Sequence, residues 1–440
     1  MESKTTQELW PSFPTLERVY IEKAEGAYLY GKDNLKILDA AGGAIVVNLG
    51  HGRKEVADAI HKATTNSSYI LPPWSCQERE QLIAELKEHW LPSYLTRVHL
   101  SSGGSEANEA AIKIAIQYQA ARGKPEKKQI LTRSLSYHGT TISMAAMSGH
   151  ASRKKGLESF LKKYTATETP YPLRCPLGKH HPEALNYYIE DLEKVIKKVG
   201  SKNIAALIAE PIIGSSGGAI TPPADYWKKA QEILKKNDIL LIADEVMTGF
   251  GRVGEKFASN LYDISPDILV AGKGMAGGYA AISGTYSTDK IVDTIGDKGY
   301  EVMFHTFAAL PQSCAASTTV LKILREENLL DKARIQGRKL KEALVEAFSD
   351  HPHVADIRGE GLLLGIEILK DKERLIPFDK KQNITFKIIE HSLEEGVFFY
   401  PGGTGDIRDI ICIGAPFIID QKEIELMIKA LTLSLNKISA

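Results

Sequence analysis

The chain has 440 residues, of which 43% are hydrophobic and 25% are charged, as is usual for a globular protein. Its 55 Lys and Arg residues balance its 55 Asp and Glu residues, so no basic excess marks nucleic acid or an anionic membrane as a partner. Composition also excludes a disordered chain, a collagen and a coiled coil, and the length indicates two domains.

The four cysteines, Cys76, Cys175, Cys314 and Cys412, lie far apart and form no CxxC pair. They predict free thiols in a reducing compartment, with neither a disulfide framework nor a metal site. The first ten residues, MESKTTQELW, contain no apolar core, so we expect no signal peptide. Because the longest apolar runs are far too short to cross a bilayer, we predict a cytoplasmic protein without a membrane partner.

The first expected element is a hairpin over residues 27–40, AYLYGKDNLKILDA, which turns at Lys-Asp-Asn. We expect the N-terminal segment, residues 1–55, to pack with the C-terminal part of the chain. From about residue 96 to 290, short apolar runs alternate with amphipathic helices or glycine-rich loops. This alternation is typical of buried, mostly parallel strands in an α/β architecture. We therefore assign residues 56–322 to one large domain.

Helices are predicted within this domain over residues 106–122, 187–199 and 226–236. The last third of the chain has a different pattern. Residues 313–348 predict two long helices separated by a break, and strand-like runs and a final helix near 421–437 follow. We assign residues 323–440 to a smaller α+β domain.

Two glycine-rich motifs suggest other functions. Gly272–Gly277 matches the GxGxxG motif of a nicotinamide-dependent oxidoreductase, but the residues after it, GYAAISGTYS, are typical of a strand, whereas the motif must open a helix. Gly214–Gly218 matches the GxSxG nucleophile elbow, but it continues as AITPP, which does not begin a helix there. We interpret both motifs as turns and keep the oxidoreductase as a distant alternative.

Four other features match what pyridoxal 5'-phosphate requires of a protein. Asp244 ends the apolar run ILLIAD, where a protonated ring nitrogen would neutralise a buried carboxylate. Lys273, which would react with the aldehyde, follows the next apolar run between two glycines. Ser101–Ala107, SSGGSEA, separates a strand from a helix, where main-chain N–H groups bind a phosphate. Tyr137, in SYHGTT, follows another strand and offers an aromatic face to the ring.

Taken singly, these features are also typical of a strand-end acid, a surface lysine, an N-capping serine and a core tyrosine. In their order and spacing, however, SSGGSEANEAAIKIA, SYHGTT, AEPIIG, IADEVMTGFGRVG and AGKGMAGGY resemble the class III pyridoxal phosphate-dependent aminotransferases. The resemblance covers nearly the whole chain. It implies fold type I, with a large domain on a mostly parallel seven-stranded sheet and a small α+β domain.

The resemblance also implies an activity and an assembly. The enzyme would transfer an amino group from an amine or amino acid to an oxo acid, pyruvate or 2-oxoglutarate, by a ping-pong mechanism. It would be a homodimer or a tetramer of such dimers. A lyase, an epimerase or a decarboxylase of the same class would share the core residues, so these activities stay alternatives, whereas a non-catalytic binding protein is disfavoured.

Individual residues acquire roles from the same resemblance. Lys273 would hold the cofactor and move a proton, and Asp244 would pair with the ring nitrogen. Val246 and Tyr137 would pack on the two faces of the ring. The other expected cofactor contacts are Gly104 and Ser105 at the phosphate, Glu210 at the edge of the site and, from the neighbouring subunit, Thr306.

Substrate recognition is less defined by the sequence. Arg408, in the glycine-rich segment GTGDIRD, resembles a mobile arginine that binds a substrate carboxylate, and pairing with a neighbouring aspartate is the alternative. Ile45 and Trp74 are the other substrate-binding candidates, and Ile45 stands where amine-specific members often have tryptophan. Cys412 replaces an arginine of the ornithine and GABA branches, so their glutamate–arginine gate is not expected here.

Overall fold

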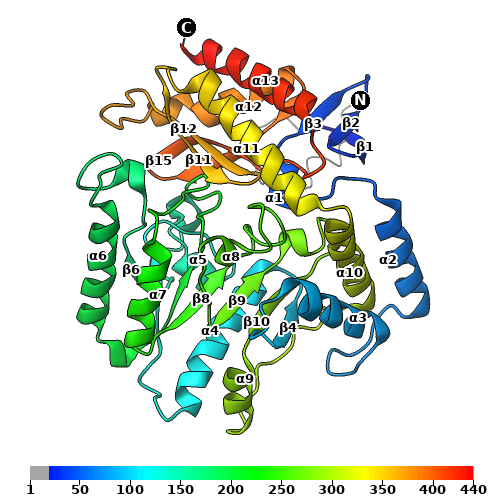
Figure 1. The fold of residues 1–440 in the computed structure, drawn as a ribbon, viewed down its shortest axis with the longest axis vertical. Helices are drawn as coiled ribbons and strands as arrows, with labels where there is room; N and C mark the ends of the chain where they lie inside the picture. Colours follow the sequence, from blue (N-terminus) through cyan, green and yellow to red (C-terminus); the bar gives the residue numbers. More distant parts are fainter. Residues whose placement is uncertain (1–18, 440) are drawn as a thin grey trace.

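The computed structural model describes residues 19–439 of the chain. The first ten residues, from which we expect no signal peptide, therefore lie outside the described residues. A seven-stranded sheet forms the lower layer of the molecule as drawn in Figure 1, and smaller sheets with their helices lie above it.

The central sheet has the strand order β4-β10-β9-β8-β7-β5-β6. The strands from β9 to β6 in that order pair in parallel, whereas β10 runs antiparallel to both of its neighbours. This is the mostly parallel seven-stranded sheet that the sequence predicts. Its strands are β4 (Arg97–Ser101), β5 (Gln129–Arg133), β6 (Thr165–Thr167), β7 (Ile204–Ala209), β8 (Leu240–Asp244), β9 (Ile268–Ala271) and β10 (Ser283–Ser287).

Helices cover both faces of this sheet because successive residues of its strands point to opposite sides. On β8, Leu240 and Ile242 pack with the helices of one face, whereas Leu241 packs with those of the other. All residues of β7 and β8 are buried, so these strands form continuous apolar runs in the sequence. The covering helices are α4 (Gly104–Ala121), α5 (Ile142–Met147) and α9 (Asp289–Gly296) on one face, and α6 (Ala184–Val199) and α7 (Tyr226–Lys236) on the other.

A further group of helices flanks the sheet at its β4 side (Figure 1). The helix α10 begins at a proline, which suits the first helical position, and packs against α2 and α3. The expected boundary between residues 322 and 323 falls inside α10, and the division into two domains stays a prediction. These helices are α2 (Lys54–Asn66), α3 (Gln77–Glu85) and α10 (Pro311–Glu326).

The C-terminal layer contains a four-stranded antiparallel sheet with the order β11-β12-β15-β14. Long helices pack over it in Figure 1. The strands are β11 (Val354–Glu360), β12 (Leu363–Ile368), β14 (Tyr400–Thr404) and β15 (Ile407–Ile413), and the helices are α11 (Leu329–Phe348), α12 (Ile384–Glu394) and α13 (Gln421–Ser439).

The N-terminal hairpin joins this layer. Its turn contains Asp33 and Asn34 at positive φ, as the Lys-Asp-Asn signal predicts. The last strand of the hairpin pairs in parallel with β13 (Val397–Phe398), so the two ends of the chain share one sheet. The N-terminal elements are β1 (Ile21–Glu25), β2 (Tyr28–Gly31), β3 (Lys36–Asp39) and the short α1 (Gly42–Ile45).

Two further observations concern the whole described chain. The four cysteines are free, as predicted from their spacing. Within residues 19–439, the search for a helix of sufficient length and hydropathy to cross a bilayer finds none.

Candidate active site

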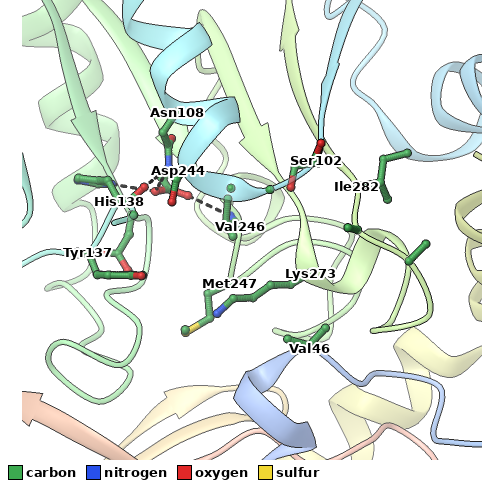
Figure 2. Close-up of a pocket in the computed structure, with 18 residues that line it drawn as sticks. Val46, Ser102, Asn108, Tyr137, His138, Asp244, Val246, Met247, Lys273 and Ile282 are labelled. Atoms are coloured by element: carbon green, nitrogen blue, oxygen red, sulfur yellow. Dashed lines mark hydrogen bonds and ion pairs between the residues drawn. The ribbon is translucent and has the colours of Figure 1, made fainter. Parts of the chain in front are cut away.

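The candidate active site lies at the carboxyl edge of the parallel strands, where open α/β sheets bind ligands. Asp244 ends β8, Glu210 follows β7, and Lys273 comes two residues after β9. Tyr137 lies in the loop after β5, and the N-terminus of α4 faces the same edge. These groups surround a cavity of about 240 Å³ (Figure 2).

Most of the predicted site residues line this cavity. They are Gly104, Ser105, Tyr137, Glu210, Asp244, Val246 and Lys273. The lining also includes residues that the sequence did not mark, chiefly Asn108, His138 and Met247.

Asp244 is held by three polar neighbours. It is 3% exposed, and its Oδ1 accepts a hydrogen bond from the main-chain N–H of Val246 at 3.1 Å. Its Oδ2 accepts one from Asn108 Nδ2 at 2.8 Å and lies 2.8 Å from His138 Nδ1 (Figure 2). Because a carboxylate only accepts, these donors fix its orientation and offset the cost of burying its charge.

Lys273 stands on a single 3₁₀ turn, η6 (Lys273–Met275), directly after β9. Its Nζ lies 3.3 Å from the carbonyl oxygen of Ala44, and in Figure 2 the side chain extends across the cavity toward Met247. Burial lowers the pKa of Lys273 to about 8, although Asp244 and Glu210 act in the opposite direction. A lysine with this pKa is partly neutral near pH 7 and is therefore an effective nucleophile.

The N-terminus of α4 provides an anion site. The first N–H groups of this 18-residue helix have no acceptor within the helix, and they carry the positive end of its dipole. A Cβ on Gly104 would lie 2.9 Å from Cγ1 of Val246, so only glycine fits there without displacing Val246. The hydroxyl of Ser105 accepts a hydrogen bond from the main-chain N–H of Thr140 at 3.1 Å, which holds the next loop against the helix.

Glu210 connects two loops at the floor of the cavity. Its carboxylate accepts hydrogen bonds from the main-chain N–H groups of Tyr137 and Gly214, each at 2.9 Å. Burial raises the pKa of Glu210 to about 7, and the charge of Asp244 adds to this effect. The Tyr137 ring is thereby held at the edge of the cavity, with the His150 ring at 6.2 Å.

The remaining predicted residues lie outside the lining of this cavity. Thr306 is exposed, and Trp74 is 67% exposed. Ile45 is buried in a neighbouring apolar cluster. Arg408 donates a hydrogen bond to the carbonyl oxygen of Phe378 at 2.7 Å and lies near two aspartates. Their roles in binding therefore stay predictions.

The two competing motifs form turns, as the sequence predicts. Gly272–Gly277 contains η6 and leads to β10 without opening an α-helix. Gly214–Gly218 is a tight turn closed by main-chain hydrogen bonds between Ile213 and Ile220. Neither motif therefore has the helix that its alternative function needs.

The groups around the cavity fit pyridoxal phosphate chemically. The N-terminus of α4 suits the phosphate, the oriented carboxylate of Asp244 suits a protonated ring nitrogen, and the amine of Lys273 suits the aldehyde. Asn108 lines the same space, and its Oδ1 has no hydrogen-bond partner within the described chain. Together with the sheet topology, these groups define a pyridoxal phosphate-dependent enzyme of fold type I.

Comparison with known proteins identifies the family. The class-III aminotransferase model matches residues 13–435, and the chain therefore belongs to this family. The chain is 35% identical to the uncharacterized aminotransferase YodT of Bacillus subtilis, over 94% of this chain and 95% of that protein. It is 33% identical to the putrescine–pyruvate aminotransferase of Pseudomonas aeruginosa, over 93% of this chain and 88% of that protein.

Solved structures agree with this assignment. The PLP-bound amine transaminase from an uncultivated Pseudomonas species has a TM-score of 0.92 and 30% identity, with 98% of each chain covered. The protein is thus a pyridoxal phosphate-dependent aminotransferase. The fold type, the cofactor and amino-group transfer are confirmed as the sequence predicts them.

Proposed function

We propose that the enzyme transfers an amino group from an amine or amino acid to an oxo acid, pyruvate or 2-oxoglutarate, in two successive half-reactions. The observation that supports this most strongly is that Asp244 ends β8, Lys273 follows the adjacent parallel strand β9, and both residues line one cavity. We also assign the enzyme to the cytoplasm, because its free thiols suit a reducing compartment.

Each residue at the cavity has a defined task in this proposal. The bound cofactor supplies an electron sink for the substrate carbon. Asp244 holds the positive charge at the ring nitrogen. Lys273 binds the cofactor between reactions, and its Nζ takes the proton from the amine-bearing carbon of the donor. Tyr137 and Val246 orient the ring, while Glu210 keeps the Tyr137 loop in place.

The proposal includes a homodimer, or a tetramer of dimers, in which Thr306 binds the phosphate of the neighbouring subunit. Its support is an exposed apolar surface: Phe307 is 66% exposed and Trp74 is 67% exposed. Arg79 brings the two segments together, because it donates hydrogen bonds to the carbonyl oxygens of Leu71 and Ala309. Exposed apolar groups of this size are typical of a surface that a partner covers.

A half-reaction experiment tests the proposed function. The loaded enzyme is mixed with donor alone, and the absorbance of the cofactor and the keto product are followed. A transaminase stops after one equivalent of product per site and resumes when an oxo acid is added. A decarboxylase, an epimerase or a lyase would continue with the donor alone, and that result would refute the proposal. A panel of amines and amino acids against pyruvate and 2-oxoglutarate then identifies the substrates.

A further inference from the structure

The proposed oxo acid carries a carboxylate, and an arginine is the side chain best suited to bind it by two parallel hydrogen bonds. Two buried arginines, Arg252 and Arg358, are already engaged. Arg252 donates hydrogen bonds to three main-chain carbonyls, those of Val47, Leu362 and Ala415. Arg358 donates to the carbonyls of Gly217 and Gly218 and pairs with two acidic side chains. Both arginines serve to join segments of the fold.

Arg153 differs from these residues in both position and partners. Its guanidinium carbon lies 4.5 Å from the centroid of the Tyr137 ring, and Tyr137 lines the cavity. The side chain is exposed, and within the described chain it makes no ion pair. Stacking uses the face of a guanidinium, so the N–H groups at its edge stay available for an anion.

Tyr400 approaches Arg153 from the other layer of the molecule. It belongs to β14, and its hydroxyl oxygen accepts a hydrogen bond from Arg153. Burial raises the pKa of Tyr400, and the charge of Arg153 acts against that rise. The same charge contributes to the lowered pKa of Lys273.

The surroundings of Arg153 are also cationic. The segment of residues 151–163, ASRKKGLESFLKK, contains five Lys and Arg residues and a single acidic one, Glu158, in a chain of zero net charge. His150 is buried beside Tyr137, and its pKa is lowered to about 4 by burial and by Arg153, so it is neutral near pH 7. A positive field of this kind attracts anionic substrates.

We propose that Arg153 binds the carboxylate of the oxo acid, and of amino acid donors, while it stacks on Tyr137. The proposal rests on the proposed transamination and assigns its substrates to carboxylate-bearing compounds. It competes with Arg408, whose guanidinium already donates to the Phe378 carbonyl and lies 3.6 Å from an Asp406 oxygen and 4.0 Å from one of Asp409.

The test measures carboxylate binding apart from turnover. Calorimetry titrates propionate and glutarate, which contain neither an amine nor an oxo group, into the holoenzyme. The variants are Arg153→Gln, Arg153→Lys and Arg408→Gln, with Lys155→Gln as the control because Lys155 is an exposed cation two residues away. Steady-state kinetics with 2-oxoglutarate, and half-reactions with the carboxylate-free donor benzylamine, complete the comparison.

We expect Arg153→Gln to weaken acid binding by about 10- to 100-fold, the usual cost of losing a charge-assisted pair. The KM for 2-oxoglutarate should rise by a similar factor, whereas the rate constant of the half-reaction with benzylamine should change much less. Arg153→Lys should weaken acid binding less than Arg153→Gln does. A lysine keeps the positive charge but cannot donate two parallel hydrogen bonds to a carboxylate. Lys155→Gln should bind as the parent does.

Three results would overturn the assignment: equal acid binding by Arg153→Gln and the parent, loss of binding in Arg408→Gln instead, or a parent enzyme that binds neither acid. A fourth result separates the two proposals. If the parent transfers no amino group from any donor but acid binding still depends on Arg153, the proposed function fails and the carboxylate site stands.

Discussion

Replacement of Asp244 by asparagine tests the electrostatic centre of the site. The carboxylate faces three donors, at 2.8 to 3.1 Å: Asn108 Nδ2, His138 Nδ1 and the main-chain N–H of Val246. An asparagine must turn its NH₂ group toward at least one of them. A buried donor left without an acceptor costs about 1–3 kcal/mol, so we expect a moderate loss of stability.

The catalytic loss should be larger than the loss of stability suggests. The neutral amide no longer neutralises a protonated ring nitrogen, and loss of a preorganised electrostatic partner costs about 2.7–4 kcal/mol, or 10²–10³ in rate. The phosphate site at α4 is untouched, so the variant should still retain the cofactor. Stopped-flow absorbance with donor alone measures the half-reaction directly.

Asp267→Asn is the matched control. Asp267 is a half-buried aspartate, and its Oδ2 accepts a hydrogen bond from the main-chain N–H of Leu241 at 2.9 Å, at the opposite end of β8. This change should lower the melting temperature but leave the half-reaction unchanged. A rate constant for Asp244→Asn within about fivefold of the parent would refute the role of Asp244, because fivefold corresponds to only about 1 kcal/mol.

Three further predictions follow from the same structure. Burial lowers the pKa of Lys273 to about 8, and the neutral amine is the nucleophile. The rate at which the apoenzyme captures the cofactor should therefore rise with pH and level off above about pH 8. A rate that still increases above about pH 10 would contradict this prediction. Gly104→Ala should weaken cofactor binding by about tenfold because its Cβ displaces Val246, and Val246→Ala should restore part of the loss; equilibrium dialysis measures both. Phe307→Asp should convert the proposed dimer to a monomer that binds the cofactor less tightly. Sedimentation velocity measures the assembly, and an active parent monomer at micromolar concentration would refute the proposed dimer.

The sequence predicts the framework of the site because that framework depends on local signals. The strands β7 and β8 are buried on both faces, so they occur as uninterrupted apolar runs, and Asp244 is conspicuous where such a run ends. The helix α7 has the predicted bounds, Tyr226–Lys236, because it is strongly amphipathic and follows a proline-rich turn. The helix α4 begins two residues before the predicted start, because glycine favours loops in isolation but here caps a helix.

Other parts of the site depend on contacts between distant segments. Asn108 and His138 hold Asp244 across 136 and 106 residues, and no spacing rule indicates such a pair. The strand β6 has three residues, too few for a periodic pattern. Arg153 lies in an exposed basic segment that is typical of a solvated surface, and its contacts with Tyr137 and Tyr400 distinguish it from its neighbours. It is therefore easier to identify from the sequence the residues that react with the cofactor than the residues that position them or bind the substrate.

The proposed mechanism depends most on the amine of Lys273, which would hold the cofactor. The most direct measurement is reduction of the loaded enzyme with borohydride, followed by digestion and peptide mass spectrometry, with Lys273→Ala treated in parallel. We expect a cofactor-modified lysine only in the peptide that contains AGKGMAGGY, at Lys273, and no modified peptide from the variant. A modification at another lysine of the parent enzyme, or an equally labelled Lys273→Ala variant, would contradict it.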